Sequence, residues 1–212
     1  MAKRKQRGPL VIGLASLKGG VGKTTSAVHL AAALGARGLD TVLMDGDRIR
    51  TATAWAAQGG LPFQVTSPAG LARVGAYDAL VIDSRGGPEG EELLELAESA
   101  DLLVLPTSAD LAGLDGISQT VELLTAGDIP AARYAALLTR ARPGRRVDEA
   151  RAGLATLGVP VFAGQIRESV AFQDAINRGV LVNEIGENKT SAACWEDYQA
   201  VAAEILKRAG RA

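Results

Sequence analysis

The chain has 212 residues, which suits one domain, because a domain of that size already buries most of the surface its unfolded chain would expose. Hydrophobic residues make up 47% and charged residues 22% of the sequence, which excludes disordered, collagen-like and highly charged linker classes. The 23 basic and 24 acidic residues give a net charge of −1, so any nucleic-acid-binding patch must be local. The single cysteine, Cys194, favours a cytosolic protein without disulfides or a thiolate metal cluster of its own.

No apolar run reaches the roughly 18 to 20 residues of a membrane span. The basic start of the chain is followed by an apolar stretch too short for a signal peptide. We therefore expect a soluble, cytoplasmic protein with no membrane partner. Residues 1–8 are interpreted as a basic, flexible arm, and residues 9–212 as one domain.

Short apolar runs alternate with helical patterns along the chain, as they do in α/β proteins. The runs predict strands at residues 10–15, 41–44, 63–65, 79–82, 102–105 and 135–138. The periodic segments predict a helix from about residue 27 to Gly35 or Gly38, and further helices at about 90–98, 111–125, 147–157 and 193–207. Right-handed crossovers between such strands give a mainly parallel sheet with helices on both faces.

The strongest chemical signal joins the first strand to the first helix, where the sequence reads KGGVGKTT. Glycines let successive backbone N–H groups curl around phosphate oxygens, and the positive helix N-terminus adds to the attraction. We expect Lys23 to face the β and γ phosphates and the Thr24 hydroxyl to ligate Mg²⁺. A plain strand-to-helix turn is the alternative, but it requires neither Lys23 nor two threonines. The predicted nucleotide-binding residues are Lys18, Gly19, Gly20, Val21, Gly22, Lys23, Thr24 and Thr25.

This segment resembles the deviant Walker A box of the ParA/MinD family of ATPases, whose mark is an additional lysine, here Lys18. The usual first glycine of a P-loop is replaced by Ser16. The resemblance implies a single-domain P-loop NTPase fold, ATP and Mg²⁺ as cofactors, and a homodimer formed on ATP binding. In that dimer Lys18 would reach across the interface to the nucleotide of the partner subunit. Residues 103–124 and 165–184 resemble the dimer-facing helix region and the penultimate segment of small ParA-type proteins.

Two carboxylate segments complete the resemblance. Asp45-Gly46-Asp47 is similar to the family's switch I, which implies that Asp47 positions the attacking water and supports Mg²⁺. The alternative interpretation is a solvated turn that caps the next helix. Asp83 ends an apolar strand in the Walker B pattern, in which the carboxylate holds a water of the Mg²⁺ shell. The predicted catalytic residues are Lys18, Lys23 and Asp47, and the predicted metal residues are Thr24, Asp47 and Asp83.

Two departures from the family pattern stand beside these carboxylates. Arg48-Ile49 replaces the usual Pro-Gln after switch I, and Ser84-Arg85 replaces Thr-Pro or Thr-Gln in switch II.

Thr139 and Arg140 follow a strand at the level where this family recognises adenine. The single histidine, His29, lies in the first helix, where a helix-surface or packing role is favoured over catalysis.

The charge is unevenly distributed. Residues 86–132 hold ten acidic residues and no Lys or Arg, whereas residues 133–151 hold six arginines. These arginines alone suggest a solvated loop and helix face. The resemblance instead implies non-specific DNA binding by basic residues of the C-terminal half. The predicted DNA-binding residues are Arg140, Arg142, Arg145, Arg146, Arg167 and Arg178.

The sequence therefore predicts a ParA-type ATPase, slow without a partner, that dimerises on ATP and binds non-specific DNA. It would segregate or position plasmid DNA, chromosomal DNA or another cargo, with hydrolysis stimulated by a ParB-like or other adaptor, on the nucleoid in the cytoplasm. One alternative is a MinD-like membrane-associated regulator, although residues 207–212 offer no apolar face for insertion. Another is a metabolic ATP-dependent ligase of the same superfamily, for which Lys18 would not be expected.

Overall fold

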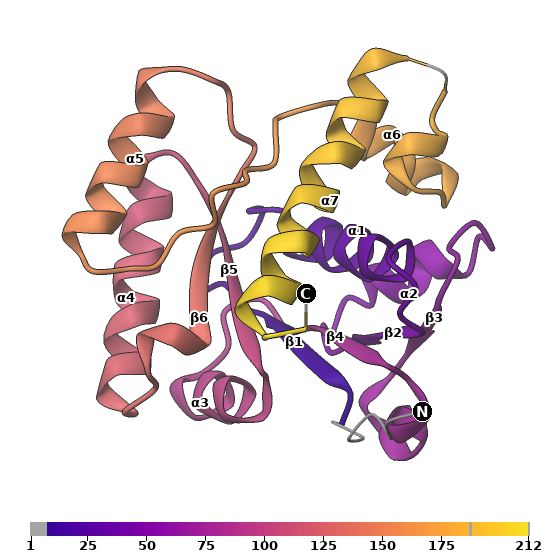
Figure 1. The fold of residues 1–212 in the computed structure, drawn as a ribbon, viewed down its shortest axis with the longest axis horizontal. Helices are drawn as coiled ribbons and strands as arrows, with labels where there is room; N and C mark the ends of the chain where they lie inside the picture. The colour runs from indigo at the N-terminus through magenta and orange to yellow at the C-terminus, as the bar shows by residue number, and fades with distance from the viewer. Residues whose placement is uncertain (1–7, 187, 212) are drawn as a thin grey trace, which may run out of the picture.

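The computed structural model describes residues 8–186 and 188–211. Its centre is a six-stranded sheet in the order β3-β2-β4-β1-β5-β6, and every pair of neighbouring strands is parallel (Figure 1). Of the predicted arm, residues 1–8, all but Gly8 lie outside the described residues. The strands are β1 (Leu10–Leu14), β2 (Thr41–Asp45), β3 (Gln64–Thr66), β4 (Ala79–Asp83), β5 (Leu102–Ser108) and β6 (Tyr134–Thr139).

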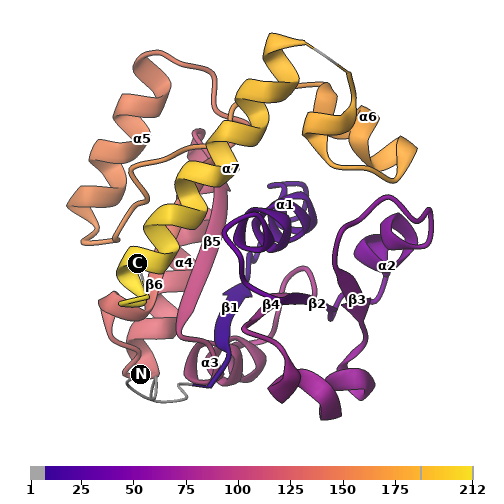
Figure 2. The same ribbon diagram turned by 45° about the vertical axis from the view of Figure 1, so that its right-hand side comes forward.

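Helices cover both faces of the sheet (Figures 1 and 2). One face carries α1, α2, α6 and α7, and the other carries α3, α4 and α5. Three short 3₁₀ segments span Pro68–Ala76, Ala131–Arg133 and Val182–Glu184. The helices are α1 (Lys23–Gly35), α2 (Thr51–Ala56), α3 (Gly90–Ser99), α4 (Leu111–Ala126), α5 (Arg145–Thr156), α6 (Ala171–Arg178) and α7 (Lys189–Arg208).

The strand sequences explain this layering. All residues of β4 and β6 are buried, because parallel strands between two helical layers have no solvent-facing side. Alternate positions point to opposite layers, so that Leu102 and Val104 join the core under α1 and α7, whereas Leu103 and Leu105 join the core under α3 and α4. The predicted parallel sheet with helices on both faces is confirmed.

Two helices were not predicted, and three helix starts differ, since α1 begins at Lys23 rather than at about residue 27. α2 and α6 have six and eight residues, too few for a clear helical period. α7 begins at Lys189, earlier than expected, because the Asn188 side chain accepts a hydrogen bond from the Ser191 N–H (2.8 Å) and caps the helix. α5 begins at Arg145, directly after Gly144, whose φ of +140° suits glycine.

Because the strands are parallel, their carboxyl ends meet at one edge of the sheet. The loop after β1, Asp45 at the end of β2, Asp83 at the end of β4 and Thr139 at the end of β6 all lie there. This edge is where open α/β sheets bind ligands. Within residues 8–186 and 188–211, no helix has the length and apolar character that crossing a membrane requires.

Candidate functional site

The loop between β1 and α1 is shaped by glycines. Gly20 and Gly22 have φ values of +77° and +79°, in the left-handed region that other residues rarely adopt. Gly22 is also the N-cap of α1, which has neither a side-chain cap nor an acidic residue in its first turn. The first N–H groups of this 13-residue helix are therefore available to an anion at the loop.

Lys23 connects this loop to the end of β4. Its ammonium lies 2.6 Å from Oδ1 of Asp83, donates to the Ser84 carbonyl and lies 3.8 Å from Oδ2 of Asp47. Lys23 is only 9% exposed and Asp83 is fully buried. The structure thus brings together Lys23, Asp47 and Asp83 from three separate segments, each of which the sequence had singled out.

One of the two carboxylate oxygens of Asp83, Oδ2, is buried without a hydrogen bond to the described residues. Burial raises the pKa of Asp83, and the charge of Lys23 and the hydroxyl of Thr24 offset part of that rise. An orphaned carboxylate oxygen beside a threonine at a phosphate loop fits the shell of a nucleotide-bound Mg²⁺.

No group of three or more His, Cys, Asp or Glu side chains with metal-binding geometry occurs in the described ranges. An ion held beside Asp83 by phosphate, water and Thr24 would have few protein ligands. This is the usual preference of Mg²⁺, which keeps several waters and few protein ligands.

The two switch I carboxylates have different tasks. Asp45 is fully buried, and its Oδ2 accepts hydrogen bonds from the N–H (2.8 Å) and hydroxyl (2.6 Å) of Thr53 in the first turn of α2. Asp45 therefore binds the first turn of α2, whose N-cap is Arg50, but the alternative of a solvated turn is wrong for Asp45, because the residue is buried. Arg50 supports the same turn by donating to the Asp45 carbonyl, and it has a positive φ of 58°.

Asp47 joins the switch I and switch II loops. Its Oδ1 accepts the Ile49 N–H at 2.9 Å, and its Oδ2 accepts the Gly86 N–H at 3.2 Å. Partial burial alone would raise the pKa of Asp47, but these N–H groups and the charge of Lys23 together hold it below its usual value. Asp47 is thus an ionised acceptor at neutral pH, at the point where the two loops meet.

The unusual residues of switch II have a local explanation. Arg85 lies 3.0 Å from Glu92 and 3.5 Å from Glu89 through its two terminal nitrogens, so it neutralises the first turn of α3. Glu89 and Glu92 also form the capping box of that helix. Arg85 therefore fixes the exit of switch II to α3 rather than pointing toward Lys23.

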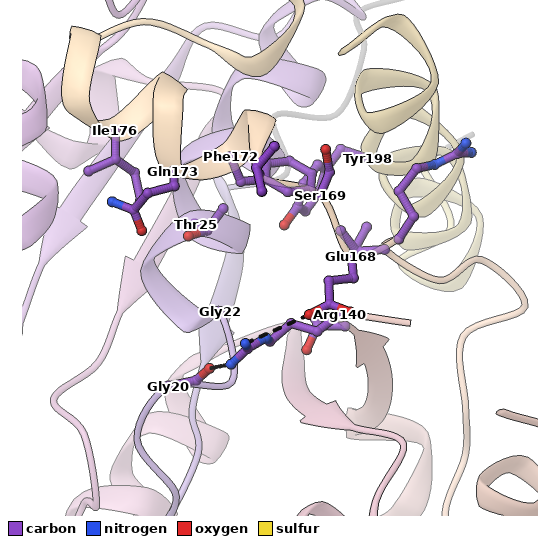
Figure 3. A pocket seen from close by; sticks show the side chains of 14 residues that line it. Gly20, Gly22, Thr25, Arg140, Glu168, Ser169, Phe172, Gln173, Ile176 and Tyr198 are labelled. Carbon is purple, nitrogen blue, oxygen red and sulfur yellow. Dashed lines mark hydrogen bonds and ion pairs between the residues drawn. The ribbon is translucent and has the colours of Figure 1, made fainter. Parts of the chain in front are cut away.

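A cavity of about 380 Å³ opens beside the loop (Figure 3). Phe172, Gln173 and Ile176 from α6 line one end, and Arg140 and Glu168 lie at the other. The remaining lining residues are Gly20, Gly22, Thr25, Thr139, Ile166, Arg167, Ser169, Val170 and Tyr198. Apolar and aromatic walls with a few polar groups are typical of a small-molecule site.

The end of β6 is tied to the loop at this cavity. The Thr139 hydroxyl donates to the Val21 carbonyl (2.7 Å), and the Arg140 guanidinium donates to the Gly20 carbonyl (3.3 Å). Arg140 has a positive φ of 49°, which is uncommon for a residue with a side chain. The two residues predicted at the adenine level therefore lie on the cavity and contact the phosphate loop.

Sequence reasoning assigned no role to Phe172, Gln173 and Ile176. The apolar pair Phe172 and Ile176, four residues apart, and the following Gly179 as a helix stop would have indicated α6. Its polar positions weaken that pattern, and the face toward the cavity becomes evident only in the folded chain.

His29 packs against Phe172 and Tyr198, two aromatic residues that line this cavity. Its Nδ1 lies 2.8 Å from the Thr25 carbonyl and its Nε2 accepts the Val182 N–H at 3.1 Å, so the neutral ring uses both nitrogens. The ring is fully buried and stacks on Tyr198, with centroids 4.9 Å apart. Desolvation lowers the pKa of His29 to about 4, although the bond to the Thr25 carbonyl acts in the opposite direction. Of the two expected roles, at the helix surface or in packing, the structure shows packing.

Three of the predicted DNA-binding arginines gather at a second cavity. Arg140, Arg142 and Arg146 line a space of about 520 Å³ together with Lys18 and Asp110. Glu168 also lines it and pairs with both Arg142 and Arg140. A local excess of positive charge thus adjoins the phosphate loop.

The other three arginines are engaged elsewhere. Arg145 is 90% exposed and pairs with Glu149 along α5. Arg167 makes a two-pronged ion pair with Asp197, with both N–O distances at 2.7 Å. Arg178, at the end of α6, donates to the Ile185 carbonyl. The six arginines therefore do not form one cluster.

Residues 12–182 match the model of the CobQ/CobB/MinD/ParA nucleotide binding domain. Since this match spans most of the chain, the protein belongs to that family. The phosphate loop and the parallel sheet described above agree with this assignment, and the expected ParA/MinD membership and single-domain P-loop fold are confirmed.

Curated relatives carry more specific names. The chain is 36% identical to Maintenance of carboxysome distribution protein A of Gloeobacter kilaueensis, over 93% of this chain and 94% of the relative. It is 26% identical to Protein ParA of Rhizobium radiobacter, over 94% of this chain and 97% of the relative. Both alignments span nearly the whole of each protein.

Solved structures show the same fold at lower identity. The ATP complex of a McdA variant from Cyanothece has a TM-score of 0.73 at 17% identity, covering 95% of this chain and 96% of that one. MinD of Pyrococcus horikoshii with Mg-ADP also has a TM-score of 0.73, at 19% identity, covering 95% of this chain and 98% of that one.

Proposed function

We propose that this protein is a ParA-type ATPase whose ATP-dependent dimer positions a cargo on DNA. The observation that carries the proposal is the meeting of Lys23, Asp47 and Asp83 at the glycine loop. A phosphate-binding turn alone would not require two carboxylates on either side of its lysine.

ATP and Mg²⁺ are the proposed cofactors. The N–H groups of residues 18–25 would surround the phosphates, and Lys23 would exchange its contact with Asp83 for the β and γ phosphates. Thr24 and Asp83 would hold Mg²⁺, whose charge offsets that of the phosphates when it is bound. The cavity lined by Thr25, Phe172 and Gln173 is the proposed adenine site.

Hydrolysis is assigned to Asp47. Its ionised carboxylate lies between the Gly86 N–H and the Lys23 ammonium, so it can accept a hydrogen bond from a water placed near the terminal phosphate. The bonds of Asp47 to both switch loops also offer a route by which an adaptor protein, ParB-like or otherwise, would stimulate turnover. Ile49, 83% exposed beside Asp47, is available for such contact.

We assign dimerisation to the surface around the phosphate loop at residues 18–25. Lys18 would reach the nucleotide of the second subunit, as the family resemblance implies. Leu111 is 87% exposed and Val170 is 82% exposed, and both belong to segments that border the two cavities. Exposed apolar side chains on a functional edge support a protein interface there.

Non-specific DNA binding is assigned to the exposed arginines after β6. Arg142 and Arg145 are 83% and 90% exposed, and Arg146 lies beside them on α5. Their exposed guanidinium groups suit phosphate contacts. Arg140 and Arg167, whose side chains are less exposed at 61% and 43%, are secondary candidates, as is Arg178, which donates to the Ile185 carbonyl. The resulting complex would be nucleoid-associated in the cytoplasm.

The name of the 36% identical relative supports a protein compartment as the cargo, and the name of the 26% identical relative supports a plasmid. We favour the compartment because the first similarity is higher. Segregation of a chromosome by the same cycle is the third possibility. Purification of tagged protein with its adaptor, followed by localisation of that adaptor on a compartment or on a centromere-like DNA site, distinguishes these cargoes.

One experiment tests the ATPase assignment directly. Purified protein is mixed with ATP and Mg²⁺, phosphate release is measured, and mass is followed by light scattering. We expect slow release and a dimer with ATP but a monomer with ADP. Absence of both release and nucleotide binding would contradict the proposal.

A further inference from the structure

Lys18 lies across the first turns of α4. A Cβ atom at Gly116 would lie 3.1, 3.2 and 3.4 Å from Cγ, Cδ and Cε of Lys18. The lysine stem therefore occupies the space that a larger residue at position 116 would take. Glycine inside a helix is less favourable than alanine, so the close approach of Lys18 is a physical reason for glycine at this place.

A second glycine fixes the helix against the sheet. A Cβ atom at Gly113 would lie 2.3 Å from the Ser108 carbonyl oxygen, so only glycine lets α4 approach the end of β5 this closely. Gly113 and Gly116 are one turn apart, and both are buried. With Lys18 they border a narrow space, whose other lining residues are Ser16, Val21, Pro106, Thr107, Ile117 and Thr120.

An acidic side chain lies near the ammonium end. Asp110 is the N-cap of α4, and its Oδ1 accepts the Gly113 N–H at 2.7 Å. Asp110 and Lys18 border the same cavity of about 520 Å³. The Gly113 N–H and the Ser108 hydroxyl lower the pKa of Asp110, and the charge of Lys18 contributes to the same direction.

We propose that Gly113, Gly116 and Asp110 form a slot that holds Lys18 when no nucleotide is bound, and that Gly116 is a positioning residue for this lysine. The proposal rests on the proposed function, in which Lys18 reaches the nucleotide of a second subunit. While its stem lies over Gly116, Lys18 is held against α4 of its own subunit. Occupation of the slot therefore competes with dimerisation, and the apparent dimer affinity falls with the fraction of Lys18 that is held.

The first experiment measures the position of Lys18 without nucleotide. The protein is treated with limiting formaldehyde and cyanoborohydride, and methylation of each lysine is followed by peptide mass spectrometry. Gly116→Ala and Gly116→Leu fill the slot, so Lys18 should react several-fold faster than in wild type, while the exposed Lys207 should not change. Unchanged reactivity of Lys18 in both variants overturns the proposal.

A matched control separates the slot from general effects of helix substitution. Gly153 is also a helical glycine, but its Cβ would meet only Leu114 Cδ1 at the ordinary distance of 3.7 Å. Gly153→Ala should leave the reactivity of Lys18 at the wild-type rate. Equal acceleration in this variant would show that loosened packing, not the slot, exposes Lys18, and would overturn the proposal.

The second experiment measures the consequence for assembly. Asp110→Asn removes the charge beside Lys18 but keeps α4 capped, because Asn and Asp are equally good N-caps. With ATP and Mg²⁺, Asp110→Asn and Gly116→Ala should lower the dimer dissociation constant by about threefold to tenfold in sedimentation measurements, and adding Lys18→Ala should abolish the gain. An unchanged or raised constant in both variants overturns the competition.

The two experiments fail separately. If wild-type protein forms no dimer with ATP, the proposed function fails, whereas the methylation rates of nucleotide-free protein still decide whether the slot holds Lys18. If wild type dimerises and Lys18 reacts alike in all variants, the slot fails and the proposed function stands.

Discussion

The ammonium of Lys23 lies 2.6 Å from Oδ1 of the buried Asp83, although 60 positions separate them in the chain. The nucleotide-free protein therefore already neutralises the carboxylate on which the proposed Mg²⁺ site depends. A phosphate group entering the loop must compete with Asp83 for this lysine, and the lost contact is replaced when a cation reaches Asp83.

Removal of Lys23 should therefore affect both stability and binding. Lys23→Ala leaves Asp83 buried without its partner, and we expect the free energy of unfolding to fall by about 3 kcal/mol. The double variant with Asp83→Asn should recover most of this loss, since no buried charge remains. Urea denaturation at neutral pH measures the free energy of unfolding of the single and double variants. If the two single substitutions lower it by amounts that add up in the double variant, the pairing of Lys23 with Asp83 is contradicted.

The same Lys23→Ala variant should bind ATP at least about tenfold more weakly, because charge-assisted contacts to phosphate are lost. Calorimetry with the folded variant tests this, with Lys207→Ala on the surface of α7 as the control. Unchanged affinity would remove the loop from the proposed nucleotide site.

Asp47→Asn keeps the shape of the side chain but removes its charge. We expect ATP binding to persist and turnover to fall by about a hundredfold, the scale of losing one such catalytic group. The ATP-bound dimer should then accumulate in light scattering. Glu98→Gln, which changes an exposed carboxylate of α3, is the control. Turnover at the wild-type rate in Asp47→Asn would contradict the assignment of water positioning to Asp47.

Gln173→Ala tests the cavity beside the loop. Gln173 lines this cavity, whereas Asn177, one turn later on α6, is not a lining residue and accepts a hydrogen bond from the Gln173 side chain (3.4 Å). We expect weaker binding of ATP, by about fivefold to tenfold for one lost polar contact, but unchanged binding of pyrophosphate. Asn177→Ala should bind ATP as wild type does. Equal loss for ATP and pyrophosphate would place the base elsewhere.

Glutamate substitutions of Arg142, Arg145 and Arg146 test the DNA assignment. The triple variant should retain ATP binding but lose DNA binding equally across unrelated sequences, because phosphates carry no sequence information. In wild type each phosphate contact contributes about −0.9 to the slope of log affinity against log salt. Lys189→Glu with Lys207→Glu gives the same type of charge change on α7 and should retain more binding. Wild-type affinity in the triple variant would show that these arginines only solvate the surface.

His29 should make stability depend on pH. Its pKa in the folded protein, about 4, lies below the unfolded value of 6.5, so the unfolded chain binds the proton first as pH falls. The contribution is fully present above pH 6.5 and is lost as the pH falls toward 4, amounting to about 2 kcal/mol between pH 7 and pH 5. Denaturation of His29→Gln should show a flatter pH dependence in this interval. An equal slope in wild type and variant would contradict the burial of a neutral ring.

The sequence predicted the sheet well because its strands are buried on both faces and therefore appear as short continuous apolar runs. The site was predicted where the chemistry is contiguous, as in the loop at residues 18–25, or where a carboxylate ends a strand, as at Asp83. The pairing of Arg85 with the first turn of α3 was not predicted, because an arginine in a switch segment gives no indication of its direction. The same holds for α6, whose role depends on the distant residues it packs against.

The position of His29 affects how much the proposed adenine site can change shape. The imidazole binds the Thr25 carbonyl at the front of α1 and the Val182 N–H beyond the end of α6, so one buried ring joins the helix that bears Thr25 to the segment that follows α6. We therefore expect these two hydrogen bonds to limit the movement of α6 relative to α1 when a base enters. A base that needs a wider cavity would have to break them, so the shape of the base would contribute to selectivity.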